Sequence, residues 1–236
     1  MQDINSILFI AAHPDDEVLG SGGTIARIAN ETKNVYVAIL GEGITSRYSR
    51  REQADVSALE NLRKSSKCVS ELLGVKELFL YDLPDNRFDT IPSLDIIKII
   101  EVLIDKVKPS TIFTHHGGDL NIDHAIIHRA TLTATRPHAG QFVKKVYAYE
   151  VPSSTEWAFG QFNMRFQANV FVDISGTLEK KIEAMEVYES EARTFPHPRS
   201  PEALRALAKR WGAAAGVEAA EAFELTASVD IKYIVP

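Results

Sequence analysis

Short apolar runs alternate with longer amphipathic segments along the first part of the chain. The runs are mostly uninterrupted by polar residues, which is typical of strands buried on both faces of a parallel sheet. Five such strands are predicted: Ser6–Ala12, Asn34–Leu40, Glu77–Leu83, Ser110–His116 and Lys144–Val151. The segments between them predict helices at about Glu17–Asn30, Glu52–Leu73, Ser93–Pro109 and Asn121–Pro137, with Ser93 as a cap.

Strands that alternate with helices predict an α/β fold in which a mainly parallel sheet lies between two helix layers. Right-handed crossovers favour a doubly wound, Rossmann-like sheet, for which we expect the strand order 3-2-1-4-5. In this order strands 1 and 4 are neighbours. Their carboxyl ends would open on the crevice where such three-layer α/β/α folds bind ligands.

The C-terminal third has a different pattern. We predict a strand at Ala168–Ser175, a helix at Leu178–Glu191 and a Pro-rich loop at Thr194–Pro201. A helix capped by Ser200 should run from Pro201 to about Ala215, and a last strand should lie at Phe223–Val229. No repeat or linker divides the chain. We therefore expect one domain over residues 1–236, with a core at 1–150 and an extension at 151–236 that completes a substrate cleft.

Composition and charge indicate which binding partners and which cellular compartment to expect. The net charge is −6 and no basic block is present, so nucleic acid is not an expected partner. The single cysteine, Cys68, excludes an internal disulfide and is typical of a reducing compartment. The first apolar run is too short for a signal peptide, and no stretch approaches the ~20 apolar residues of a membrane span. We expect a cytoplasmic protein without a membrane span.

Polar side chains crowd the point where the first strand ends, in the sequence His13-Pro14-Asp15-Asp16-Glu17. Pro14 favours an extended conformation at His13. His13 and Asp16 could then converge, and an imidazole with a carboxylate suits Zn²⁺ and similar ions. The alternative is a plain helix start, with Asp16 as the cap and the acids at the positive end of the helix dipole. The stretch by itself fits both interpretations.

Gly20, Gly22 and Gly23 follow this acidic turn and superficially resemble a phosphate loop. A dinucleotide fingerprint needs its glycines directly after the strand, and the acids would repel a pyrophosphate. Close helix packing or substrate approach is the better interpretation of these glycines.

A second polar cluster follows the fourth strand, in THHGGDLNIDHAIIH. His124 lies in the first turn of the following helix, beside strand 1, where it can complete a set with His13 and Asp16. Three protein ligands with open positions are typical of a catalytic site. His128 is deeper in the helix and fits the core or a supporting role, and at least one of His115 and His116 is expected to be structural.

The stretches AAHPDDEVLGSGGTIA and HHGGDLNIDHAIIHRATLTATRP resemble the LmbE-like, or PIG-L, de-N-acetylases, over roughly Ile4–Tyr149. That family consists of zinc-dependent hydrolases of N-acetylglucosamine-type amides. The resemblance implies that His13, Asp16 and His124 hold Zn²⁺, with Fe²⁺ or Co²⁺ as alternatives, and that Asp15 is the general base. It also implies a small N-acetylated sugar or glycoconjugate as substrate and acetate as product.

The chain departs from that family at one position. Many members carry His-Pro-Asp-His in the second motif, where the first His stabilises the oxyanion, and this chain has Asn121-Ile122-Asp123-His124. Asn121 can donate a neutral hydrogen bond but no proton, and His197 in the Pro-rich loop is a candidate substitute.

Further residues are candidates for substrate contact. Arg63 lies where such enzymes often place a sugar-contacting arginine, although a solvated helix face explains it equally. Asp85 and Asn86 follow the third strand and could line the rim of the crevice, or simply form a turn. The aromatic-rich segment Tyr147–Phe166 could wall the sugar site or form an interface in a homo-oligomer.

Two other functions stay open at this point. A metal-dependent amidase for another acyl amide, such as a thiol conjugate, would use the same ligands with a different pocket. A non-catalytic Rossmann-type binding protein is the alternative from another class, but the missing glycine fingerprint and the Asp15 carboxylate disfavour it.

Overall fold

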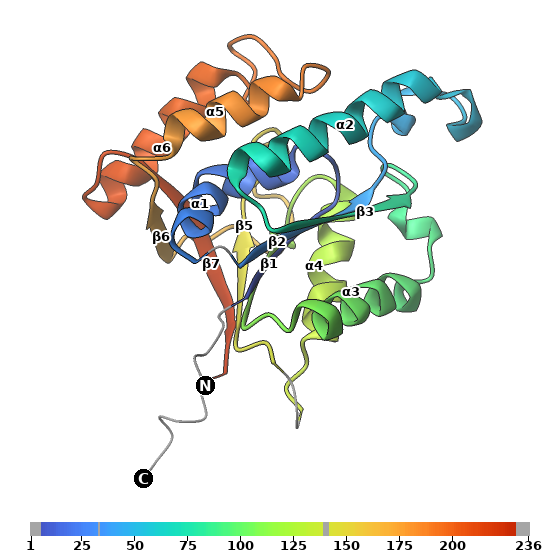
Figure 1. The fold of residues 1–236 in the computed structure, drawn as a ribbon, viewed down its shortest axis with the longest axis horizontal. Helices are drawn as coiled ribbons and strands as arrows, with labels where there is room; N and C mark the ends of the chain where they lie inside the picture. The colour runs from blue at the N-terminus through green and yellow to red at the C-terminus, as the bar shows by residue number, and fades with distance from the viewer. Residues whose placement is uncertain (1–5, 33, 139–141, 230–236) are drawn as a thin grey trace.

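The computed structural model describes residues 6–32, 34–138 and 142–229. The described residues form a seven-stranded sheet in the order β3-β2-β1-β4-β5-β7-β6 (Figure 1). Its parallel strands are β1 (Ile7–Ala11), β2 (Val35–Gly41), β3 (Glu77–Leu83), β4 (Thr111–His115) and β5 (Lys145–Tyr149). The predicted order of the first five strands and the doubly wound α/β class are confirmed.

Helices cover both faces of the sheet (Figure 1). One layer holds α1 (Asp16–Thr32), α2 (Val56–Leu73), α5 (Leu178–Val187) and α6 (Pro201–Ala215). The other layer holds α3 (Ser93–Val107) and α4 (Ile122–Ala134). Short 3₁₀ turns lie in the connecting loops: η1 (Thr45–Arg47), η2 (Arg51–Gln53), η3 (Phe88–Thr90) and η4 (Glu156–Ala158).

The central strand β1 explains why the apolar runs are continuous. Phe9 and Ala11 belong to the core under the α1 layer, whereas Leu8 and Ile10 belong to the core under the α3–α4 layer. Alternate side chains of a strand point to opposite faces, so a strand covered on both faces needs apolar residues at every position.

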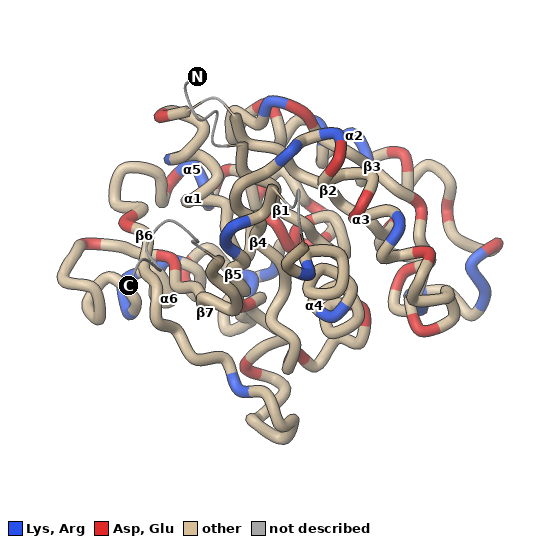
Figure 2. Tube along the Cα trace, turned by 90° about the horizontal axis from the view of Figure 1, so that it is seen from below, with Lys and Arg blue, Asp and Glu red and all other residues tan. Residues whose placement is uncertain are grey.

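Charged residues of both signs are interspersed over the helices and loops (Figure 2). Several acids are nevertheless buried, and they gather at the loops that follow β1, β3 and β4: Asp15, Asp16, Glu17, Asp85, Asp119 and Asp123. Among the described residues, no helix is long and apolar enough to cross a membrane.

Two predicted helix starts differ from the structure. α2 begins at Val56 and not near Glu52, because the side chain of Asp55 accepts hydrogen bonds from the backbone N–H groups of Ser57 and Ala58 and caps the helix there. Ser93 is the first residue of α3 and not its cap. The cap position is Pro92, which makes no side-chain hydrogen bond.

The extension adds two antiparallel strands, β6 (Val170–Asp173) and β7 (Ala220–Ser228), to the sheet. β7 begins before the predicted Phe223 because its first residues pair with the end of β6. α5 ends before the predicted Glu191, since the chain turns at the buried Tyr188. The predicted cap of α6 is confirmed, with Ser200 Oγ accepting from Ala203 N.

A buried ion pair fastens the extension to α1. Lys181 donates to Glu221 Oε1 at 2.6 Å and to the carbonyl oxygen of Leu19 at 2.9 Å. The two carboxylate oxygens of Glu221 accept from the backbone N–H groups of Gly23 and Thr24 at 3.0 and 2.7 Å.

Gly20 and Gly23 of α1 allow neighbouring side chains to pack close to the helix. A side chain at Gly20 would collide with the ring of Tyr149, and one at Gly23 with Ile174. The interpretation of these glycines as close-packing positions is therefore confirmed.

Candidate metal and catalytic site

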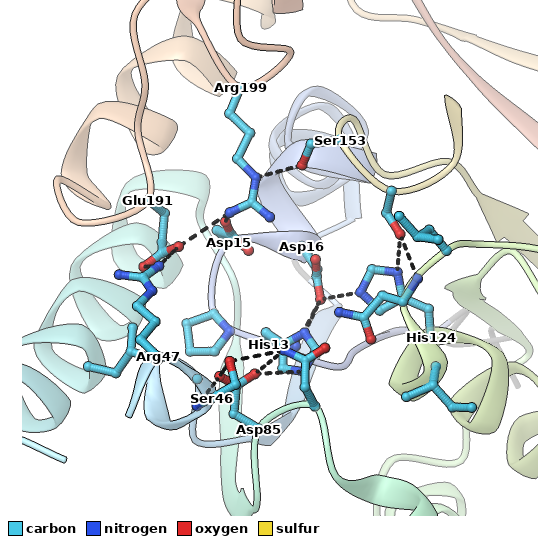
Figure 3. A pocket seen from close by; sticks show the side chains of 18 of the residues that line it. His13, Asp15, Asp16, Ser46, Arg47, Asp85, His124, Ser153, Glu191 and Arg199 are labelled. Carbon is cyan, nitrogen blue, oxygen red and sulfur yellow. Dashed lines mark hydrogen bonds and ion pairs between the residues drawn. The ribbon is translucent and has the colours of Figure 1, made fainter. Parts of the chain in front are cut away.

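A cavity of about 500 Å³ opens at the carboxyl ends of the central strands (Figure 3). Its lining comes from the loops after β1, β2, β3 and β4 and from the extension. The lining includes His13, Asp15, Asp16, Ser46, Arg47, Asp85, Asn86, Asn121, His124, Ser153, Glu191 and Arg199. Side chains that are far apart in sequence thus meet at the predicted edge of the sheet.

The loop after β1 places His13 and Asp16 together. The backbone N–H of His13 donates to Asp16 Oδ2 at 2.8 Å, which closes a tight turn around Pro14. The Nε2 atom of His13 lies 2.9 Å from Asp123 Oδ2. The other ring nitrogen, Nδ1, lies 3.4 Å from Asp16 Oδ2.

His124 is placed by the start of α4, where Asn121 caps the helix by accepting from Asp123 N at 2.9 Å. The Nδ1 atom of His124 lies 2.8 Å from Asp119 Oδ2, so Nδ1–H donates to this buried carboxylate. Nε2 is buried without a hydrogen-bond partner and lies 3.3 Å from Asp16 Oδ2.

One ring nitrogen of each histidine therefore faces the same carboxylate oxygen. The ligand atoms of His13, Asp16 and His124 lie within 4.8 Å of one another, and all three residues are buried. Two overlapping groups, His115–Asp119–His124 and His13–Asp85–Asp123, also satisfy this spacing. Their added carboxylates already accept hydrogen bonds from histidine, serine or backbone groups. The donor set of His13, Asp16 and His124 fits a divalent cation of the zinc type.

The electrostatics of this cluster favour positive charge. Burial lowers the pKa of His124, but Asp16 and Asp119 outweigh burial and raise that pKa to about 9. Burial also lowers the pKa of His13, but its hydrogen bonds to Asp123 and Asp16 outweigh burial and raise that pKa well above its ordinary value. The carboxyl of Asp16 has a pKa well below its usual range, because His124 and His115 overcome the effect of burial.

Asp15 sits beside this set in a backbone conformation that is rare for a non-glycine residue, with φ of 109°. Its N–H donates to Glu17 Oε2 at 3.1 Å, and its carbonyl oxygen accepts from Val18 and Leu19 at the start of α1. Arg199 Nη1 donates to Asp15 Oδ2 at 2.7 Å. Burial raises the pKa of the Asp15 carboxyl well above its usual range, and Arg199 opposes that rise.

Glu17 has a larger role than a helix-dipole partner. It is buried and accepts a hydrogen bond of 2.6 Å from the hydroxyl of Tyr188 in the extension. Burial raises the pKa of Glu17 to about 7, against the opposing Tyr188 bond. Through its bond to the N–H of Asp15, Glu17 supports the strained turn.

Arg199 was not predicted from the sequence. It is oriented by three groups: Asp15, Ser153 Oγ at 2.9 Å from Nε, and Glu191 Oε2 at 3.3 Å from Nη1 (Figure 3). Glu191 also accepts two hydrogen bonds, of 2.6 and 2.7 Å, from Arg47. The only sequence signal for Arg199 is its position in the Pro-rich loop, and from that loop we predicted His197 instead.

The remaining predicted residues fall into two groups. Asp85, Asn86 and Asn121 line the cavity, and Asp85 accepts from the N–H and hydroxyl of Ser46. Arg63 and His197 do not line it. Arg63 pairs with Asp82 on the surface of the protein. His197 packs edge-on against Trp157 and accepts from the backbone N–H of Arg199.

Two other histidines, at the end of β4 and on α4, pack against the site. His115 Nε2 accepts from Ala12 N at 2.7 Å, and its ring stacks on His124 at 3.9 Å between centroids. His128 Nδ1 donates to the carbonyl oxygen of His115 at 2.8 Å. Burial lowers the pKa of both His115 and His128, which favours their neutral form, and both act as packing groups.

Fold and site together define a class: doubly wound α/β proteins whose central crevice gathers buried histidines and aspartates that could hold a metal ion. Within this class, the chain belongs to the PIG-L family. The family model described as GlcNAc-PI de-N-acetylase matches residues 8–135, which is more than half of the chain. The matched part contains all three proposed metal ligands and Asp15, but neither Glu191 nor Arg199.

Known proteins share this similarity at modest identity. The diacetylchitobiose deacetylase of Thermococcus kodakarensis is 25% identical over 80% of this chain and 71% of its own length. The N,N'-diacetylchitobiose deacetylase of Pyrococcus horikoshii superposes with a TM-score of 0.74 at 21% identity, covering 98% of this chain and 87% of that one.

The 4-carboxy-2-hydroxymuconate hydratase GalB of Pseudomonas putida superposes with a TM-score of 0.75 at 20% identity, over 98% of this chain and 100% of that one. These structural likenesses therefore establish the fold and do not select a reaction.

Proposed function

We propose that this protein is a metal-dependent hydrolase that removes the N-acetyl group from an N-acetylglucosamine-type sugar and releases acetate. The observation that carries this proposal is the meeting of two buried histidine nitrogens with one Asp16 oxygen, directly beside Asp15. Membership of the PIG-L family and the deacetylase names of its relatives support the choice of reaction.

The cation would be held by His13, Asp16 and His124. Zn²⁺ suits this ligand set best, with Fe²⁺ and Co²⁺ as alternatives. A divalent cation there supplies the charge that lowers the pKa of a water and polarises an amide carbonyl. Asp123 and Asp119 orient the two histidines by hydrogen bonds to their far nitrogens.

Asp15 is the proposed general base. Arg199 fixes its Oδ2 atom, and the other carboxylate oxygen takes the proton of the attacking water. The new C–O bond forms as the amide carbonyl becomes tetrahedral. Asp15 then returns the proton to the amine nitrogen as the C–N bond breaks, so acetate and a free amino sugar leave.

Asn121 is the proposed donor to the developing oxyanion. Its Oδ1 atom is occupied by the cap of α4, which directs the amide nitrogen elsewhere and leaves its N–H groups as donors. Asp85 and Asn86 are the proposed contacts for sugar hydroxyls, because both line the cavity. The extension completes the site as part of one domain, since it contributes Ser153, Glu191 and Arg199.

Acetate release from a panel of N-acetylated sugars, with the Zn²⁺-loaded protein, tests the function. Asp15→Asn should lower kcat by about 10²–10⁴-fold while the bound metal stays stoichiometric. Asp89→Asn, an exposed carboxylate outside the cavity, is the matched control and should retain the wild-type rate. A near-normal rate in Asp15→Asn would refute the base assignment. If the protein hydrolyses a thiol-conjugate amide and does not act on N-acetyl sugars, the proposed function changes from deacetylase to amidase.

A further inference from the structure

Three large apolar side chains are exposed at the mouth of the catalytic cavity. Leu120 and Ile122 are each 51% exposed, and Trp157 is 39% exposed, yet all three line the same cavity as His13 and Asp16. Scattered exposed apolar residues are ordinary on a protein surface. Three on the rim of one catalytic cavity form a surface that a ligand can cover.

This apolar rim, formed by Leu120, Ile122 and Trp157, is held in place by hydrogen bonds between its two loops. The N–H of Leu120 donates to the carbonyl oxygen of Ser154, and the N–H of Asn121 donates to Ser154 Oγ, both at 3.2 Å. The start of α4 and the loop before η4 therefore lie side by side. The ring of Trp157 is further braced by His197, with 5.4 Å between centroids. These contacts hold the two loops of the rim together.

The charges in the cavity limit what the ligand can carry. Among its described lining residues, the basic side chains are Arg47 and Arg199, both already paired with Glu191, and His13 and His124, both already paired with buried carboxylates. Arg199 is also paired with Asp15. An anionic group on the substrate would have to displace one of these pairs, and it would face the carboxylates of Asp15, Asp85 and Glu191.

We propose that the substrate is an uncharged N-acetylhexosamine glycoside whose aglycone is apolar and packs on Leu120, Ile122 and Trp157. The sugar would enter with its acetamide toward Asp15 and Asp16, and the aglycone would leave the cavity across the rim. A flat aryl group matches Trp157 best, because aromatic rings stack or pack edge-to-face. This inference rests on the proposed deacetylase function and adds the class of aglycone.

The test compares kcat/KM for acetate release from phenyl, methyl and malyl N-acetylglucosaminides of both anomers and from diacetylchitobiose. The phenyl glycoside should exceed the methyl glycoside by about tenfold, because its ring is removed from water on the rim. The malyl glycoside should be the poorest substrate. The difference should be found mainly in KM, since the aglycone is remote from the reacting bond.

Variants locate the effect. Trp157→Ala and Leu120→Ala should each reduce the phenyl-to-methyl ratio toward one. Leu94→Ala is the matched control, because Leu94 is 59% exposed on α3 and lies outside the cavity, and its ratio should stay at the wild-type value.

Equal rates for phenyl and methyl glycosides would overturn the aglycone proposal and leave the deacetylase function standing. A preference for diacetylchitobiose over the phenyl glycoside would also overturn it, because the rim would then hold a second sugar. Absence of acetate from every member of the panel would refute the proposed function itself. A phenyl preference that survives both rim variants would place the aglycone elsewhere and contradict the proposal.

Discussion

Two buried polar clusters border the same helix, α1, and they differ in how completely their groups are paired. Near the middle of α1, Lys181 and Glu221 satisfy each other and three backbone groups of the helix. At the start of α1, ring nitrogens of His13 and His124 face the same Asp16 oxygen, and Nε2 of His124 has no hydrogen-bond partner. The first cluster is a complete hydrogen-bond network, and the second is one that the proposed cation would complete.

This difference separates a structural from a functional buried cluster. A buried charge that is fully paired stabilises one arrangement of the chain, although its net contribution is small because of desolvation. A buried polar atom without a hydrogen-bond partner, such as Nε2 of His124, costs free energy in the isolated chain, and such atoms are expected where a ligand completes the site. Burial and charge alone do not distinguish the two clusters, since both are inaccessible to solvent.

The largest expected effect comes from Asp16→Asn, which removes the shared anionic ligand. We expect bound metal to fall from stoichiometric to near zero after dialysis, and the deacetylation rate to fall by about 10³-fold or more. Elemental analysis and an acetate assay measure both. Full metal occupancy in this variant would show that another group, such as His13–Asp85–Asp123, is the site.

Lys181→Met should instead reduce stability, by about 3–5 kcal/mol, because it leaves Glu221 as an unpaired buried charge. Urea denaturation measures this loss, and metal content should stay at the wild-type level. The double variant Lys181→Met/Glu221→Gln should recover part of the loss. Metal depletion in folded Lys181→Met protein would mean that the two clusters are not independent.

Asp119→Asn should have a smaller effect, which we expect on the affinity for the metal ion. The amide cannot accept from both His124 and Thr155, so His124 loses part of its orientation, and we expect metal binding to weaken about 10- to 100-fold. Chelator competition measures the affinity. Thr155→Val removes only one of the two bonds and should weaken binding less. Equal affinity in Asp119→Asn and the wild type would argue against a supporting role.

Glu150→Gln should have the smallest effect, one that depends on pH. Glu150 lines the small cavity beside Lys181, and burial raises its pKa to about 7. A carboxyl whose pKa is raised by folding stabilises the folded state below the unfolded value near 4.5 and loses that contribution as pH rises through about 7.

The neutral glutamine escapes this loss, so Glu150→Gln should be more stable than the wild type by about 1–2 kcal/mol at pH 8 and nearly equal to it at pH 5. Unfolding curves at the two pH values make the comparison. A stability difference that does not change with pH would show that Glu150 ionises normally.

The parts of this molecule that sequence could predict are those with local signals. The parallel strands follow from continuous apolar runs, and His13, Asp16 and His124 follow from polar motifs placed directly after two of those strands. Neighbouring parallel strands bring such motifs together without any further information. The ligand roles of these residues stay predictions until a metal is measured.

Long-range contacts escaped prediction. β7 lies between β5 and β6 in the sheet, and nothing in its own residues specifies those neighbours. Arg199 reaches Asp15 across 184 positions, and Tyr188 reaches Glu17 across 171. The residues around Arg199 and Tyr188 in the sequence do not indicate these distant partners. Arg63 was predicted to contact substrate from its position in a helix, but it pairs with Asp82.

The segment 153–155 joins the two sides of the site. Ser153 bonds to Arg199, which is paired with the proposed base Asp15, and Thr155 bonds to Asp119, which is hydrogen-bonded to the proposed metal ligand His124. A one-residue insertion or deletion here would shift the Asp15 side and the His124 side of the site at the same time. Inherited or engineered changes of this loop should therefore alter the proposed proton transfer and the proposed metal binding in step.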